Sequence, residues 1–227
     1  MKVQNPPLDS ESVRQMHELW LVVFGSDFVS DVLYGEENHW NRTNIYRHIP
    51  EEQTISTAIV ISPFALPSLG GLGEVSTDTR FRGKGLATRI CKQLVEDCQS
   101  TEGLALFLGT VNPDAARIYE CLGWQHINGP KLMVNLSDTD DYDDIIRRYF
   151  ATSIPSKICK AKSEARIPII PLVLFPHDWS ILDSNISLYS TNVELQLSCL
   201  GLYRRYDYLR THCQGEWFKC FLQGAVL

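Results

Sequence analysis

The sequence predicts a mixed α/β (α+β) fold in a larger N-terminal domain, followed by a smaller C-terminal α+β unit. Two observations lead to this prediction. Segments rich in β-branched residues alternate with segments whose apolar residues recur every three or four positions, which is typical of strands alternating with amphipathic helices. The composition then changes at Ser137, where five aspartates within eight residues precede a basic stretch. We therefore expect a domain over residues 1–136, a charged connection over 137–165 and a small domain of unknown role over 166–227.

Composition argues against several classes of protein. The 227 residues carry a formal net charge of −6, whereas domains built to hold nucleic acid usually present a basic face, so no nucleic-acid partner is expected. No apolar stretch is long enough to cross a membrane, and the first ten residues lack the apolar core of a signal peptide. The seven cysteines are odd in number and scattered. We therefore expect reduced thiols in a cytoplasmic protein without a metal site. The protein is expected to be a monomer or a homodimer.

The first third of the chain contains one clear helix and two strands. Apolar residues at helical spacing predict a helix over Ser10–Phe24, with Ser10 as its N-cap. A polar and aromatic loop follows, and then the β-branched segment Thr54–Ser62 is typical of a strand. Gly70-Gly71 is expected to turn the chain into a second strand over about Leu72–Thr77.

The most informative element is a strand that turns through Gly83 and Gly85 into a helix. Such a turn leaves unpaired backbone N–H groups at the positive end of a helix, and this arrangement binds phosphate. Arg82 and Lys84 add charge suited to a pyrophosphate or a 3′-phosphate. Taken alone, the pattern fits a plain strand-to-helix turn equally well. It is neither a P-loop nor the dinucleotide-binding fingerprint.

A second helix and two further strands are expected downstream. Leu104–Leu108 is a short apolar run typical of a buried strand. Asn112-Pro113 opens a helix that Gly123 ends, and Lys131–Leu136 supplies one more strand. The inner face of the helix is formed by Ala115, Ile118, Tyr119 and Leu122.

The C-terminal unit has a sparser pattern. Arg166–Phe175 is strand-like but contains two prolines, Thr191–Glu194 fits a capping box before a helical stripe, and Glu216–Leu222 is expected to be a last strand. His177-Asp178 fits either an acid–base pair or an ordinary turn. The basic run over 147–166 fits either a solvated face or a site for an anion. The unit as a whole is expected to cover an acceptor site, to pack elsewhere or to form a dimer contact.

Two motifs together resemble a known family. Residues 73–87, GEVSTDTRFRGKGLA, are similar to the cofactor-binding motif of the GCN5-related N-acetyltransferase (GNAT) family, and residues 112–124, NPDAARIYECLGW, are similar to its second signature. The resemblance extends over about residues 10–136. It implies a mostly antiparallel central sheet with two strands splayed apart, flanked by helices. It also implies a strand before the first helix, which must be short or lost here.

The resemblance further implies a site for acetyl-CoA or another acyl-CoA, and an amine acceptor. Tyr119 would protonate the departing thiolate, and Glu74 is the candidate general base, although the position of this base varies within the family. A packed tyrosine and a non-catalytic strand glutamate are the alternatives. The residues implied to bind the cofactor are Val75, Ser76, Thr77, Phe81, Arg82, Gly83, Lys84, Gly85, Leu86, Ala87, Asn112 and Ala115.

These expectations support an N-acyltransferase that moves an acyl group, with acetyl as the first candidate, from CoA to a primary amine of a small molecule or peptide. Two alternatives keep the same cofactor site. One is a catalytically silent acyl-CoA-binding module that senses or recruits. The other is a related acyl-CoA activity such as decarboxylation.

Overall fold

The structure of the chain is a computed structural model. The described residues are 1–25, 30–101, 103–127, 131–137, 141–144, 154–160, 162–168, 170, 182–183, 188–189 and 218–223.

A seven-stranded sheet forms the centre of the molecule, in the order β1-β2-β3-β4-β5-β7-β6. Every neighbouring pair is antiparallel except β4 and β5, so the predicted mixed and mostly antiparallel sheet is confirmed. The strands are β1 (Lys2–Gln4), β2 (Asn41–His48), β3 (Ser56–Pro63), β4 (Leu69–Thr77), β5 (Ala105–Gly109), β6 (Gln125–Ile127) and β7 (Leu132–Leu136).

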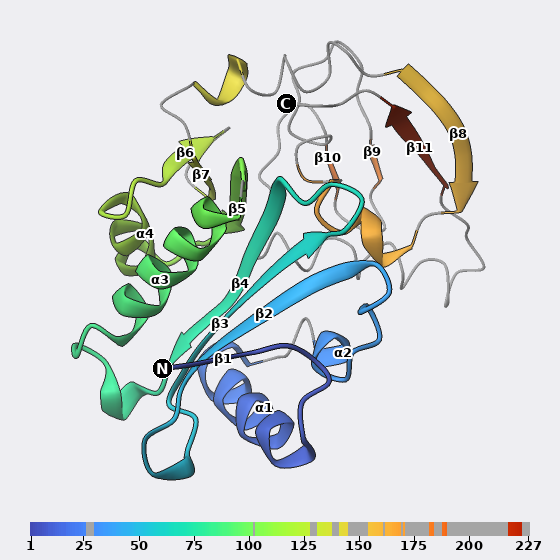
Figure 1. Cartoon of the computed structure of the whole chain (residues 1–227). Coiled ribbons are helices and arrows are strands. Elements are labelled where there is room, and N and C mark those ends of the chain that lie inside the picture. Colours follow the sequence, from blue (N-terminus) through green and yellow to red (C-terminus); the bar gives the residue numbers. More distant parts are fainter. Residues whose placement is uncertain are drawn as a thin grey trace.

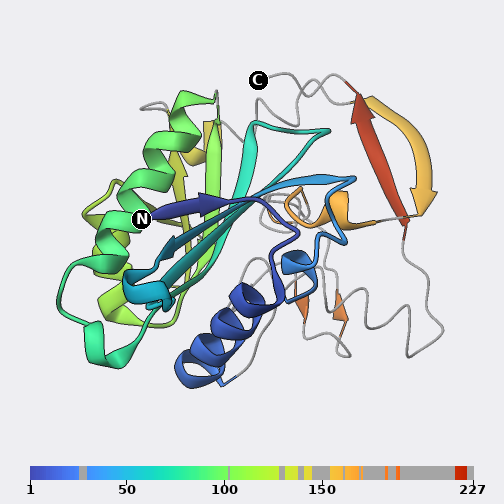
Figure 2. The same ribbon diagram turned by 60° about the horizontal axis from the view of Figure 1, so that its bottom comes forward.

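Helices cover both faces of this sheet, giving three layers (Figures 1 and 2). One face carries α1 (Ser10–Phe24) and the short α2 (Ser30–Leu33), and the other carries α3 (Leu86–Ser100) and α4 (Pro113–Glu120). Each face has its own apolar core. Trp20 and Phe107 belong to the α1 side, whereas Leu94 and Leu106 belong to the α3 side. No helix in the described ranges is long and apolar enough to cross a membrane.

The N-cap of the first helix lies one residue earlier than expected. The N-cap is Asp9, whose carboxylate accepts a hydrogen bond from the Ser12 N–H at 2.8 Å, so the prediction of Ser10 as the cap was wrong. Aspartate satisfies an otherwise unpaired donor and places negative charge at the positive helix end. Gly25 ends the helix in the left-handed region at φ 72°. The expected bounds Ser10–Phe24 are confirmed.

Strand β2 lies in the segment expected to be a loop. Asn41, Thr43 and Arg47 are polar yet buried, and they face the α1 side of the sheet. Inward-facing polar residues remove the alternation by which a half-buried strand is normally identified. The strand before the first helix is present and short, as β1.

Gly70 and Gly71 lie inside β4 and do not form the expected turn. A Cβ atom on Gly70 would lie 2.5 Å from Leu106 Cδ2, so glycine here permits the close approach of β4 to β5. The parallel pairing of these strands covers only Leu69 to Gly71, and β4 then continues to Thr77 without β5. The two strands therefore splay apart, as the family resemblance implies.

The chain after Leu136 contributes to the first core. Tyr142, Ile167 and Ile170 are buried among apolar side chains of α1 and the sheet. Residues 166–168 form a turn after the 3₁₀ helix Ser163–Ala165, so the strand expected from Arg166 was wrong in its described part.

Two further pairs of strands lie in the C-terminal part. β8 (Ile154–Lys160) pairs antiparallel with β11 (Phe218–Gln223), and β9 (Leu182–Asp183) pairs with β10 (Leu188–Tyr189). The final strand is confirmed, whereas β8 occupies part of the expected connection. His177-Asp178 and the helix expected after Thr191 lie outside the described residues.

Candidate functional site

The turn between β4 and α3 presents a row of main-chain N–H groups. A 3₁₀ helix, Thr79–Phe81, is followed by Gly83 at φ 74° and Gly85 at φ 68°, and α3 begins at Leu86. Gly85 is the N-cap and has no side chain to bond the first turn. Within the described ranges, no hydrogen bond is made by the N–H groups of residues 83–88. An anion would satisfy these donors at the positive end of the helix.

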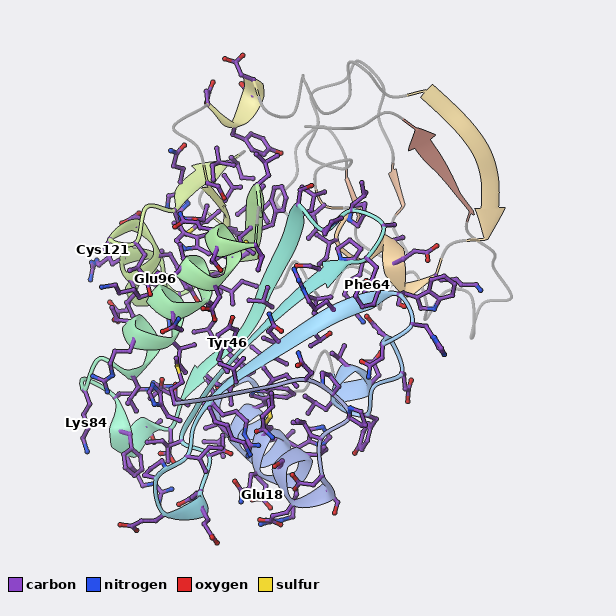
Figure 3. All side chains as sticks on the ribbon, in the orientation of Figure 1. Glu18, Tyr46, Phe64, Lys84, Glu96 and Cys121 are labelled. Atoms are coloured by element: carbon purple, nitrogen blue, oxygen red, sulfur yellow. The ribbon has the colours of Figure 1, made fainter. Side chains whose placement is uncertain are left out.

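Three basic residues lie in this turn or in the first turn of α3. Arg82, Lys84 and Arg89 form no ion pair with any residue that the structure describes. Figure 3 shows the Lys84 side chain extending away from the ribbon, and its Nζ lies 4.9 Å from the centroid of the Phe81 ring. By contrast, Arg80 is paired with Asp78 at 2.7 Å. Arg89 was not predicted as a phosphate-binding residue. Its position one helical turn after Gly85 is the feature of the sequence that could have indicated it.

The stretch Val75–Thr77 leads directly into this turn. It lies on the part of β4 that has separated from β5, so its backbone on that side has no strand partner in the described sheet. The Ser76 and Thr77 hydroxyls face opposite sides of the sheet and bond to Thr57 and Ser56 of β3. Main-chain groups are therefore what this stretch offers to a ligand.

Glu74 lies in a β-bulge that the sequence did not indicate. Two residues of β4, Glu74 and Val75, stand opposite the single residue Ala58 of β3. Glu74 has φ 52° and is 6% exposed. A non-glycine residue in the left-handed region costs about 1–3 kcal/mol, and such strain clusters at functional sites. The structure thus places the candidate base at a distorted position beside the unpaired stretch of β4.

Asn112 is the N-cap of α4. Its Oδ1 accepts hydrogen bonds from the N–H groups of Asp114 and Ala115, at 3.0 and 3.4 Å. Pro113 occupies the first helical turn, as predicted. The Asn112 side chain therefore has a structural role, and its contact with a cofactor stays a prediction. Ala115 is partly buried against the core of the α3 side.

Tyr119 is buried between α3 and α4. It is 5% exposed, and its ring centroid lies 5.7 Å from that of Trp124. Burial, with a smaller effect of the neighbouring Cys91, raises the pKa of the Tyr119 phenol well above its ordinary value of 10.0. The phenol therefore keeps its proton at neutral pH, as a general acid must.

Tyr119, Val75 and Ala115 pack with the core of α3 on one face of the sheet, whereas the Ser76 hydroxyl lies on the other face. Cys91, beside Tyr119, lies five residues after Leu86, which is about 7–8 Å along the axis of α3 from the glycine turn. Glu74 lies three residues before Thr77, which is about 10 Å along β4. The described residues contain no group of His, Cys, Asp or Glu side chains arranged to hold a metal.

Comparison with known proteins gives one family and several partial structural matches. Residues 47–131 match the family model described as FR47-like protein. No curated protein sequence matches the chain.

Three of the similar solved structures illustrate the extent of the likeness. A GNAT-family acetyltransferase from Staphylococcus aureus has 12% identity and a TM-score of 0.48, with 60% of this chain and 100% of that chain covered. An acyl-CoA N-acyltransferase from Pseudomonas aeruginosa has 14% identity and a TM-score of 0.49, covering 59% and 97%. A GNAT-family N-acetyltransferase from Escherichia coli, in complex with CoA, has 16% identity and a TM-score of 0.46, covering 61% and 81%.

The matched residues 47–131 include the splayed strand, the glycine turn, α3 and α4, and therefore both motifs on which the family resemblance was based. Over these residues the chain matches the FR47-like protein model.

Proposed function

We propose that this chain is an N-acyltransferase that moves an acyl group from a CoA thioester to a primary amine. The observation that carries the proposal is the glycine turn, where the N–H groups of residues 83–88 make no hydrogen bond to any residue that the structure describes and Arg82, Lys84 and Arg89 lie in or next to the turn. This donor set fits a pyrophosphate with a further phosphate nearby. The unpaired edge of β4 runs from this turn toward Glu74 and suits an extended, amide-containing arm.

The reaction assigns one task to each remaining group. An amine attacks a thioester only when neutral, so Glu74 would take its proton, directly or through water. A C–N bond then forms and the C–S bond breaks. A main-chain N–H of the β4 edge would stabilise the negative charge that develops on the acyl oxygen. Tyr119 would donate its proton to the leaving thiolate. An acyl-CoA supplies the activated acyl group, and the chain supplies binding, orientation and proton transfer.

The cofactor half of the proposal is tested by thermal denaturation with and without acetyl-CoA. Binding to the folded state raises the midpoint of unfolding. The substitution Gly85→Asp adds an anionic side chain in the middle of the donors, so the shift should disappear.

Gly25→Asp is the matched control. Gly25 also lies at a helix end with φ 72°, but on α1 and away from the turn, so this variant should keep the shift. A wild-type protein whose midpoint does not move at saturating acetyl-CoA, propionyl-CoA or longer acyl-CoA would contradict the proposal.

A catalytically silent acyl-CoA-binding module is the second candidate, and the deep burial of Tyr119 favours it. The two candidates differ in turnover. Thiol release from acyl-CoA, followed across a broad panel of amines and short peptides, separates them. Release that depends on one class of amine supports the transferase, whereas binding without release for every amine supports the silent module.

A further inference from the structure

The β-bulge at Glu74 is held from the opposite face of the sheet. The Thr57 hydroxyl of β3 lies 2.8 Å from the Glu74 carbonyl oxygen and 2.7 Å from the Ser76 hydroxyl. Trp20 of α1 donates its indole N–H to the same Thr57 oxygen at 3.0 Å. Trp20 and Thr57 are fully buried, and Ser76 is 2% exposed. We call Trp20, Thr57 and Ser76 the bulge clamp.

Donor and acceptor roles in the bulge clamp are constrained. An indole N–H only donates, so the Thr57 oxygen accepts from Trp20 and has one proton left to donate. The Glu74 carbonyl only accepts, and it lies where two residues of β4 stand opposite one residue of β3. Thr57 therefore donates a hydrogen bond to the backbone of the bulge itself. A buried hydroxyl and indole N–H would be left unsatisfied if this arrangement were lost.

The bulge clamp lies on the side of the sheet away from the glycine turn. Trp20 packs in the core of the α1 side, whereas α3 and its N-terminus lie on the other face (Figure 2). Trp20 and Thr57 would therefore act on the site through the β4 backbone, without touching a bound acyl-CoA.

We infer that Trp20 and Thr57 are positioning residues, which hold the strained Glu74–Ser76 backbone so that its carboxylate and main-chain N–H groups are aligned for acyl transfer. This inference rests on the proposed function for its catalytic consequence. Its structural part, that Thr57 fixes the bulge, stands independently of any activity.

The test compares Thr57→Val, Thr57→Ser and Trp20→Phe in the full chain. Valine keeps the shape of threonine but cannot donate, so kcat of acyl transfer should fall about tenfold to a hundredfold, the cost of a small misalignment. KM for acyl-CoA and the thermal shift with acetyl-CoA should change less than about twofold, because the glycine turn is untouched. Thr57→Ser keeps the hydroxyl and should stay near wild type. Trp20→Phe should lower kcat to an intermediate value.

Thr43→Val is the matched control. Thr43 is a buried threonine on the same face of the sheet, and its hydroxyl has no hydrogen-bond partner among the described residues. This variant should leave kcat unchanged. Equal kcat values for wild type and Thr57→Val, or equal losses in Thr57→Val and Thr43→Val, would overturn the inference.

Amide hydrogen exchange on the cofactor-free protein measures the order of the bulge backbone without requiring activity. It therefore shows whether this inference or the proposed function has failed. Thr57→Val should speed exchange at residues 74–76, and Thr43→Val should not. Unchanged exchange would refute the positioning role even in an active enzyme. Faster exchange in a protein that never binds acyl-CoA would support the bulge clamp and refute the proposed function. If Thr57→Val does not fold, Trp20→Phe becomes the variant expected to lose kcat, and Thr57→Ser remains the variant expected to stay near wild type.

Discussion

At the scale of single residues, Tyr119 is the most direct test of chemistry. Its phenol is buried and stays protonated, so it suits a proton donor, but its contacts with Trp124 also suit a packing role. Tyr119→Phe removes only the hydroxyl. If the hydroxyl protonates the leaving thiolate, kcat should fall about tenfold or more while the thermal shift with acetyl-CoA stays nearly intact. Wild-type turnover in this variant would assign Tyr119 to the core.

The raised pKa of the Tyr119 phenol leads to a prediction about how kcat depends on pH. Burial raises its folded-state pKa above the unfolded value, so the neutral form stabilises the fold at every pH below about 10 and this contribution is lost only at higher pH. The acid therefore keeps its proton across the range in which the acceptor amine becomes neutral. We expect kcat to show no fall between about pH 7 and pH 9 from loss of the Tyr119 proton. A pH–rate profile of wild type beside Tyr119→Phe checks this, and a fall present only in wild type would contradict it.

Prediction from the sequence succeeded for some site residues and failed for others. Gly83 and Gly85 were predicted to be permissive turn residues, and both have positive φ. Glu74 also has positive φ, but no propensity assigns that conformation to glutamate, because the strain is maintained by tertiary contacts from Thr57. Asn112 was identified by its motif, yet its capping bonds follow from ordinary helix chemistry.

At the scale of secondary structure, α1 provides a test of its own start. Asp9 accepts from the Ser12 N–H and also lies near its hydroxyl, at 2.8 Å in both cases, whereas Ser10 is the first helical residue. Asp9→Ala should lower the thermal midpoint, and Ser10→Ala should leave it nearly unchanged. Hydrogen bonds from Ser12 lower the pKa of Asp9, so its contribution is present above the unfolded pKa and fades as pH falls through the folded one. The difference between the two variants should therefore shrink in acid.

Helices were predicted better than strands for a physical reason. The apolar stripes of α1, α3 and α4 face a core and repeat at helical spacing, so the sequence contains the pattern directly. Strand β2 buries Asn41, Thr43 and Arg47, and the hydrogen-bond partners of Asn41 and Arg47 lie outside the strand. Gly70 looked like a turn residue because its contact with Leu106 is invisible until β4 and β5 are paired.

At the scale of the whole molecule, a buried ion pair joins distant parts of the chain. Arg166 has no exposed surface, and its Nε donates to both oxygens of the Glu37 carboxylate at 3.1 Å. Asn41 donates to the same carboxylate at 2.8 Å and to the Ser163 carbonyl oxygen at 3.0 Å. Lys162 adds a cation–π contact with Trp40 at 4.5 Å. The end of the basic run is thereby fixed to the start of β2.

Removing one partner of this pair should be costly. Arg166→Met leaves the Glu37 carboxylate buried without its guanidinium, and the free energy of unfolding should fall by about 3–5 kcal/mol. The double variant Arg166→Met with Glu37→Gln should recover part of this loss, because the buried Glu37 charge is removed and only the partly exposed Asp31 carboxylate, 3.7 Å from the guanidinium, has lost its partner. Arg117→Met is the control, since its pair with Asp114 is exposed and contributes little. Urea denaturation of the four proteins measures the differences, and a small loss in Arg166→Met would contradict the prediction.

The position of Tyr142, Ile167 and Ile170 in the first core also bears on where the polypeptide can be divided. A fragment ending at Leu136 would lack these side chains, and it would expose their apolar contacts and the Glu37 carboxylate. A second fragment starting at Ser137 would contain Arg166 without its partner Glu37. Expressed separately, the two pieces should aggregate or be degraded; expressed together, they should recover a soluble complex that purifies through a tag on either piece.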